Sequence, residues 1–355
     1  MGFLRLFLAF SVVLGHTWQG GYPYTLTGAA AVQCFYVISG YYMAMILEEK
    51  YQSAIGTFYL NRALRIWPSY LFALFLSIFY LSWLCLNTGL VHGPFVQLIY
   101  LHQRFSPGTW VFWIFSSIFL LGQDLSGLFH LDPTGHMIFS FFSANSPGAL
   151  SFDYFISQAS TLAIELAFYG MAPWIVRWSN KVLIPVSCLG LIFQTWCHFN
   201  ENWLGAWVGR MTPIDIWTFY WGILAFRLSK KSELKWIRNP WIGLAFAVFL
   251  LSYRFIPLNP AILLALIAVF SALSIPSLAF HSEKIPGNRI SGEFSYPLYL
   301  IHNLAIWIAI DVHSSFFGIP AMAIALSFLL ASLILILIER PMEVVRRDVA
   351  KSAKA

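Results

Sequence analysis

The hydrophobic positions of the chain fall into ten long runs, separated by shorter stretches that contain polar residues, glycine or proline. A run of about 20 mostly apolar residues is long enough to cross the hydrocarbon core of a bilayer as an α-helix. The pattern therefore predicts an all-α membrane protein with ten transmembrane helices. The runs lie at residues 3–20, 26–47, 66–88, 154–176, 182–199, 211–228, 240–256, 258–280, 294–311 and 316–338.

There is an eleventh apolar run at 108–122, and the positions of the positive charges test whether it also crosses the membrane. Cytoplasmic loops collect Lys and Arg. With the N-terminus inside and ten spans, 18 of the 21 Lys and Arg residues fall at the inner face. The other three, Arg104, Arg210 and Arg254, fall outside. An eleventh span would reverse every later loop and move most of these charges outside. We therefore expect both termini in the cytoplasm and a re-entrant or interfacial segment near 108–122, within a long outer segment at 89–153.

The composition agrees with a membrane protein, because 59% of the residues are hydrophobic and only 10% are charged. A soluble domain carries about 25% charged residues. The net charge of +6 follows the inner loops, which indicates contact with membrane lipid and not with nucleic acid. The four cysteines show no CxxC spacing, so we expect no metal site. We divide the chain into one membrane domain, 1–340, and a short basic cytoplasmic tail, 341–355.

Ionisable residues within the spans are the first candidates for function, because each is costly unless it faces protein or water. Arg5 and His16 lie eleven residues apart on the first span, which places them on one face and about 17 Å apart along the axis. This spacing predicts Arg5 near the cytoplasmic mouth and His16 deep in the protein. The alternative is an arginine that snorkels to lipid headgroups and a histidine with a structural hydrogen bond.

Glu165 and His302 lie about halfway through the fourth and ninth spans. A lone carboxylate in an apolar run needs a partner or a raised pKa. Imidazole titrates near neutrality and suits proton transfer, although a single buried histidine is more often structural. Two histidines and one glutamate in a small bundle favour a functional site.

Arg62 and Arg65 lie in the predicted loop between the second and third spans, three residues apart. This spacing places both on one helical face at the cytoplasmic boundary. Paired guanidinium groups bind phosphates in a forked geometry. The alternative is a general attraction to anionic lipid headgroups.

Taken together, these motifs resemble the acyltransferase-3 family of polytopic membrane acyltransferases, over the length from the first span to the C-terminus. The most specific is the Arg5–His16 pair, with its ten intervening residues. The others, in chain order, are FYVISGY at 35–41, RALRIWP at 62–68, TLAIELAFY at 161–169, SYPLYLIH at 295–302 and ERP at 339–341. Ser160 and Leu166 depart from the family pattern, where many members have Trp and a second Glu. A role that needs two adjacent carboxylates is therefore not expected.

The resemblance implies an enzyme that transfers an acyl group, in particular acetyl from acetyl-CoA, to a hydroxyl of a glycan, exopolysaccharide or oligosaccharide. It implies acyl-CoA as a co-substrate and no tightly bound cofactor. Arg5, Arg62 and Arg65 are the expected ligands of the donor's phosphates, and His16 is the expected general base. Glu165 is expected to orient a histidine or hold the acceptor.

Two further residues have open roles in this scheme. His302 is a second candidate acid or base. Ser39 is expected either to donate a hydrogen bond near the oxyanion or to carry the acyl group transiently, and direct transfer ranks first.

The expected partners are the acyl-CoA donor, membrane lipid, and a carbohydrate or lipid-linked saccharide acceptor. The expected location is the bacterial inner membrane. Aromatic residues of the 89–153 segment are expected to stack against sugar rings.

The main alternative function is a transporter or flippase for a saccharide or lipid-linked substrate, since buried charges also mark permeation paths. Transporters of this kind commonly show internal repeats and broken helices in corresponding halves. The sequence shows no such repeat. A non-catalytic scaffold is the third possibility, and it leaves the buried charges without a role.

Overall fold

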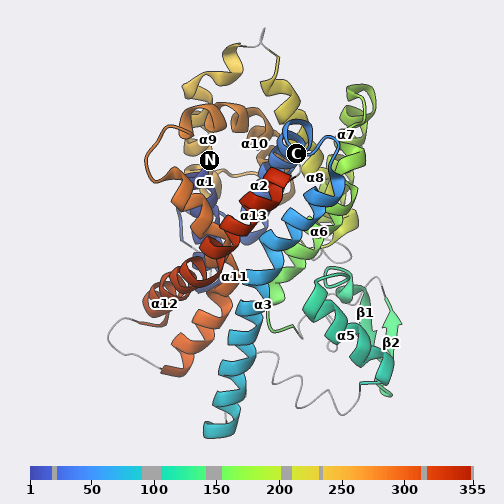
Figure 1. The fold of residues 1–355 in the computed structure, drawn as a ribbon, viewed down its shortest axis with the longest axis vertical. Helices are drawn as coiled ribbons and strands as arrows, with labels where there is room; N and C mark the ends of the chain where they lie inside the picture. Colours follow the sequence, from blue (N-terminus) through green and yellow to red (C-terminus); the bar gives the residue numbers. More distant parts are fainter. Residues whose placement is uncertain are drawn as a thin grey trace.

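The protein is a bundle of helices with one small β-hairpin (Figure 1). The computed structural model describes residues 1–17, 22–89, 105–140, 154–200, 210–231, 235–312 and 318–352. The helices are α1 (Gly2–Thr17), α2 (Gly28–Glu49), α3 (Ile55–Thr88), α5 (Pro107–Phe119), α6 (Ser160–Ile175), α7 (Asn180–Phe199), α8 (Thr212–Ser229), α9 (Pro240–Ser252), α10 (Pro260–Ser282), α11 (Asn288–Val312), α12 (Gly318–Ile334) and α13 (Arg340–Ser352). Short turns of other helix types are η2 (Ser126–Leu128), η5 (Ser157–Ala159), η7 (Lys235–Arg238), η8 (Tyr253–Phe255) and the π-helical η9 (Leu335–Glu339).

Each of the ten predicted runs contains a helix, which confirms the nearly all-α fold. In the described part of the chain, five helices are both long and apolar enough to cross a membrane: α2, α3, α7, α10 and the continuous segment Gly318–Lys351. Helix α1 and the segment Pro240–Phe255 are apolar but shorter. Ten spans with cytoplasmic termini therefore stay a prediction.

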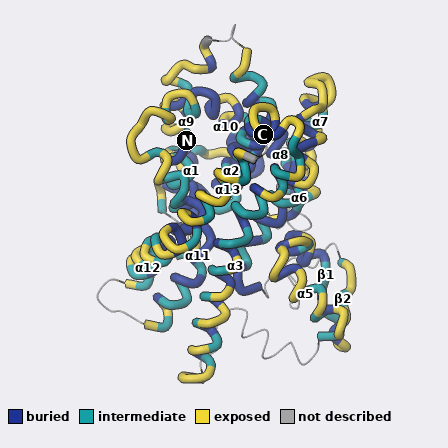
Figure 2. The backbone as a smooth tube through the Cα atoms, in the orientation of Figure 1, coloured by how far each residue is buried: buried dark blue, intermediate teal, exposed yellow. Residues whose placement is uncertain are grey.

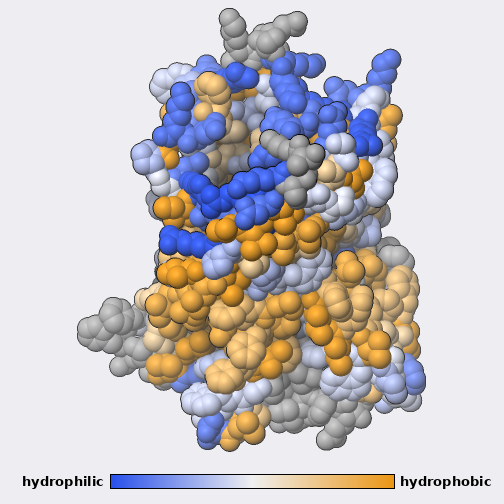
Figure 3. All heavy atoms as spheres, in the orientation of Figure 1, coloured by the Kyte–Doolittle hydropathy of each residue, from blue (hydrophilic) through white to orange (hydrophobic). Residues whose placement is uncertain are grey.

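On the face shown in Figure 3, apolar side chains cover the middle of the molecule, below a polar end. On α3 alone, Phe75 and Phe79 are 61% and 60% exposed, and α7 and α12 also present exposed apolar side chains (Figure 2). In water such a surface is an aggregation hazard, whereas in a bilayer it contacts lipid tails. The protein is therefore an integral membrane protein.

Both ends of the chain lie in the half of the molecule that carries the polar end (Figure 1). The amino group of Met1 hydrogen-bonds to Ser282 and, at 3.2 Å, to Asn288 Oδ1. The Gly2 amide donates to the same Asn288 oxygen at 2.6 Å. These bonds attach the start of α1 to α10 and α11. Termini on one side agree with an even number of spans.

Helix α3 begins at Ile55, eleven residues before the predicted third span. Arg62 and Arg65 therefore lie within a helix, and their placement in a loop was wrong. Hydropathy marks only the part of a helix that meets hydrocarbon, whereas the backbone stays helical beyond it because unpaired peptide groups are costly near the membrane. Pro68 lies inside this helix, where it removes one backbone hydrogen bond.

The 108–122 segment forms helix α5, which is followed by an antiparallel hairpin of β1 (Phe129–Leu131) and β2 (Met137–Phe139). The hairpin is a local departure from the predicted all-α fold. Asp132 explains it, because its carboxylate accepts hydrogen bonds from the amides of Thr134 and His136 and so stabilises the turn. The re-entrant or interfacial position of α5 stays a prediction.

Helices α2 and α8 pack closely through two glycines. A Cβ atom at Gly40 would lie 2.0 Å from the Phe219 carbonyl oxygen, and one at Gly222 would lie 2.1 Å from the Val37 carbonyl oxygen. Small residues at such crossings let two membrane helices approach each other. Gly40 directly follows Ser39, so this contact also determines where Ser39 lies.

We expect Gly222→Ala to destabilise the protein by about 1–3 kcal/mol, because the added methyl group forces α2 and α8 apart. The measurement is the melting temperature of the purified protein in detergent. Gly170→Ala is the matched control, since a Cβ at this helical position meets no atom within 4 Å. Equal melting temperatures for wild type and Gly222→Ala would contradict the close helix contact.

Candidate active site

A cavity of about 300 Å³ brings together five of the seven predicted site residues: Arg5, Ser39, Arg62, Arg65 and Glu165. They come from α1, α2, α3 and α6, and α11 and α13 complete the wall. The predicted donor arginines therefore face one enclosed space. His16 and His302 are not among the residues that line it.

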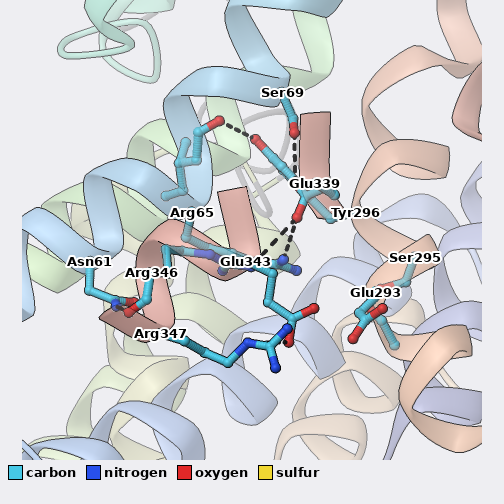
Figure 4. Close-up of polar contacts among 12 residues, drawn as sticks. Asn61, Arg65, Ser69, Glu293, Ser295, Tyr296, Glu339, Glu343, Arg346 and Arg347 are labelled. Atoms are coloured by element: carbon cyan, nitrogen blue, oxygen red, sulfur yellow. Dashed lines mark hydrogen bonds and ion pairs between the residues drawn. The ribbon is translucent and has the colours of Figure 1, made fainter. Parts of the chain in front are cut away.

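Arg65 forms an ion pair with Glu339 of η9, with 2.6 Å between Nη1 and Oε2 (Figure 4). Ser69 donates a hydrogen bond to the other Glu339 oxygen at 2.7 Å. The Arg65 and Glu339 side chains are only 16% and 5% exposed. A buried charge needs such a partner, because removing either member leaves the other uncompensated. The pair therefore holds α3 against the junction of α12 and α13.

The cavity wall carries more positive than negative charge. Its described lining contains Arg5, Arg62, Arg65 and Arg346 but one acidic residue, Glu165. When Glu339 is paired with Arg65 and Glu165 with a second arginine, two of the four arginines still have no matching negative charge. Enclosed excess positive charge attracts an anion, and guanidinium groups match the oxygens of a phosphate.

Glu165 accepts hydrogen bonds from two hydroxyl groups on the cavity wall. Ser39 Oγ donates to Glu165 Oε1 at 2.6 Å, and the Tyr169 hydroxyl donates to the same oxygen at 2.5 Å. Tyr169 lies one helical turn after Glu165 on α6, so the two side chains meet on one face. These two bonds hold the Glu165 carboxyl group in one orientation at the cavity wall.

The two predicted histidines form a pair, although 286 positions separate them in the sequence. His302 Nε2 lies 3.2 Å from His16 Nδ1, and the ring centroids are 5.0 Å apart. His302 is fully buried, whereas His16 is exposed in the last turn of α1. The expectation of a deeply buried His16 was therefore wrong. His16 is the last residue but one in the described part of α1.

The surrounding carbonyl groups determine where the protons of this pair lie. His302 Nδ1 is 2.6 Å from the Tyr299 carbonyl oxygen, so this nitrogen carries the hydrogen and His302 Nε2 accepts. His16 Nδ1 lies 3.0 Å from the Val12 carbonyl oxygen and 3.2 Å from His302 Nε2, so its single hydrogen is shared between these two acceptors. In neutral His16, Nε2 then has a free lone pair.

Tyr299 lies between the cavity and the histidine pair. Its side chain lines the cavity, and its ring centroid is 5.9 Å from that of His302. Its hydroxyl shares a hydrogen bond of 2.8 Å with Thr161, another lining residue. Tyr299 thus connects the cavity to the buried His302, and His302 in turn contacts the exposed imidazole of His16.

Four residues of this site were not singled out in the sequence: Tyr169, Tyr299, Glu339 and Arg346. The first three lie within motifs quoted above, so they were visible but had no predicted role. Arg346 lies in the segment that was interpreted as a basic tail. Its position among other charged residues gave no signal that separated it from its neighbours.

The aromatic residues expected to meet a sugar are partly inward-facing. Trp113 of α5 is buried, and its ring stacks on Tyr154 with 6.3 Å between centroids. Within the described residues, no group of three or more His, Cys, Asp and Glu side chains is arranged to hold a metal ion.

Comparisons with curated proteins and with solved structures found no match. A comparison with protein-family models matches residues 1–339 to an acyltransferase domain family. This match includes all six motifs on which the resemblance was based, apart from the last two residues of the ERP motif. The chain therefore belongs to the acyltransferase-3 family, and the protein is a membrane acyltransferase.

Proposed function

We propose that the protein transfers an acetyl group from acetyl-CoA to a hydroxyl of a glycan, exopolysaccharide or oligosaccharide. The observation that carries this proposal is the arrangement of the site. A cavity with excess positive charge is connected through Tyr299 to a pair of histidines, of which His16 lies exposed toward the other end of α1 from Arg5. In this proposal the anionic donor enters through the cavity, the neutral hydroxyl acceptor approaches the exposed side of His16, and the two meet at the histidine pair.

Arg5, Arg62 and Arg65 bind the phosphate-bearing end of the donor in this scheme. The donor's extended arm then passes Ser39, Glu165 and Tyr299 toward the histidine pair. Arg5 and His16 are roughly 17 Å apart along α1, which is comparable to the length of that arm. The bonds from Ser39 and Tyr169 hold Glu165 in place, so we assign Glu165 to ordering this wall and not to orienting a histidine.

The transfer itself is a direct acyl exchange. The acceptor oxygen attacks the thioester carbonyl while His16 Nε2 removes its proton, so that a new C–O bond forms. The tetrahedral intermediate then loses the thiolate of coenzyme A as the C–S bond breaks. The imidazolium of His16 returns its proton to that sulfur, which leaves the ester and free coenzyme A.

His302 is a positioning residue in this mechanism. It accepts a hydrogen bond from His16 Nδ1–H and is itself fixed by the Tyr299 carbonyl group. This arrangement keeps the hydrogen of His16 on Nδ1 and the lone pair on Nε2. The role is analogous to that of the group that orients the base in a hydrolase triad.

The cell envelope is the place where such an acceptor is found, so we propose the bacterial inner membrane with both termini in the cytoplasm. The family match does not favour the transporter or flippase alternative. The two functions also differ in a measurable product, since a transporter moves its cargo without adding an acyl group.

We expect cells that lack the protein, and cells that carry only His16→Ala, to lose one acetyl group from a surface or secreted glycan. Mass spectrometry of those glycans is the measurement. General-base catalysis contributes about 10²- to 10⁴-fold, so the residual activity of His16→Ala should be small. His281→Ala is the control, because this histidine bonds to the Arg238 carbonyl group, away from the site. Identical glycans in all strains would contradict the proposed transfer.

For His302, we expect removal of the hydrogen bond in His302→Leu to lower kcat by roughly 3- to 10-fold, the value of one hydrogen bond. His302→Gln should recover part of this loss, because its amide oxygen is able to accept from His16. The KM for acetyl-CoA should stay unchanged in both variants. A loss in His302→Leu as large as that in His16→Ala would contradict a positioning role.

A further inference from the structure

We infer that the C-terminal helix α13 completes the donor site and that Arg346 is a fourth phosphate ligand. The inference rests on the proposed function for the identity of the donor, but its structural basis is independent. Arg346 lines the cavity beside Arg62 and Arg65, although it lies beyond residue 339, where the family match ends.

The backbone of α13 is fixed to α3 at the position of Arg346. Asn61 Nδ2 donates to the Arg346 carbonyl oxygen at 2.9 Å (Figure 4). Arg62 Nη2 donates to Asn61 Oδ1 at 3.0 Å. Asn61 is only 5% exposed. One buried amide thus connects the two arginines, so their relative position is built into the contact between the two helices.

The Arg346 side chain is only 14% exposed, and its charge is incompletely balanced. Its Nη2 lies 3.9 Å from Glu339 Oε2, which is too long for a hydrogen bond. That carboxylate already accepts from Arg65 and Ser69. Among the described residues, the buried Nε atoms of Arg346 and Arg62 have no hydrogen-bond partner.

Two guanidinium side chains with unpaired N–H donors, from two helices, line one cavity, so a ligand in that cavity with anionic oxygens would balance their charge. A donor left unsatisfied in a buried site is costly, and a charged acceptor offsets the largest part of that cost. Phosphate oxygens match guanidinium groups in charge and in forked geometry. The ligand class is therefore a phosphate or pyrophosphate group, as at the nucleotide end of coenzyme A.

The next residue, Arg347, provides the contrast. Its side chain is 59% exposed and lies 3.7 Å from Glu343 on its own helix. It does not line the cavity. Successive helical residues point about 100° apart, so one face of α13 serves the cavity and another meets the surroundings. If the tail served only to attract lipid headgroups, we would not expect Arg346 to be buried at the cavity while Arg347 is exposed.

The test uses the full-length protein in detergent and measures binding of coenzyme A and of pantetheine, which lacks the phosphates. We expect Arg346→Gln to weaken coenzyme A binding by about 10-fold or more, as for a charged hydrogen bond, and to leave pantetheine binding unchanged. The KM for acetyl-CoA should rise with kcat unchanged. Arg347→Gln, the matched control, should leave both ligands unaffected.

Three results overturn the inference. These are equal coenzyme A binding by wild type and Arg346→Gln, an equal loss of coenzyme A and pantetheine binding, and equal losses in Arg346→Gln and Arg347→Gln. The last result, joined to weaker binding of both variants to anionic vesicles, identifies a lipid-binding tail.

Inorganic pyrophosphate separates this inference from the proposed function. If pyrophosphate raises the melting temperature of wild type but not of Arg346→Gln, while neither protein binds coenzyme A, the anion site stands and the acyl-CoA donor is wrong. If wild type binds neither ligand, both proposals are wrong.

Discussion

The structure depends on how a membrane protein accommodates positive charge in its interior. A guanidinium group in a medium of low dielectric constant is tolerated only with a paired anion, a hydrogen-bonding partner or access to water. Arg65 has all of its charge balanced by Glu339, and that pair connects α3 to the end of α12. The arginines around it are balanced less completely. The same helices that bury one charge as a structural element thus present others to a ligand.

The two parts of the site obey different physical requirements, and this explains their separation. In the proposed function, phosphate binding needs concentrated positive charge, which the cavity provides near the start of α1. General-base catalysis needs an imidazole that takes up a proton, and excess positive charge nearby would disfavour the imidazolium that forms. His16 lies about three helical turns from Arg5 on α1, and it contacts His302, whose ring meets that of Tyr299. Distance along one helix thus separates two groups that would otherwise interfere.

Much of this arrangement is readable from the sequence, because the relevant signals are local. Apolar runs locate the helices, and the spacing of Arg5 and His16 predicts a shared face. Glu165 and His302 stand out because charge and imidazole are rare in such runs. Five of the seven predicted residues line one cavity, and the other two meet each other.

The remaining features arise from contacts between distant segments. The bond between His16 and His302 depends on how α1 packs on α11, and no spacing along the chain encodes it. Arg346 and Arg347 are adjacent and chemically identical, so only the packing of α13 on α3 distinguishes them. A hydropathy pattern does not detect polar helical turns such as the start of α3. It reports which residues are apolar enough to contact lipid, not which residues have a helical backbone. The hairpin after α5 depends on a turn made by a single aspartate.

The length of α3 has a consequence for how the donor reaches the site. Its 34 residues span roughly 51 Å, and even at a tilt of about 40° they cover roughly 39 Å of membrane depth. The hydrocarbon core is only about 30 Å thick. Arg62 and Arg65 lie in the first three turns, whereas the exposed Phe75, Phe79 and Trp83 follow toward the other end. Under the proposed function, the arginine-bearing turns stand at the level of the headgroups, so that the donor's nucleotide end enters sideways from the aqueous boundary without crossing lipid.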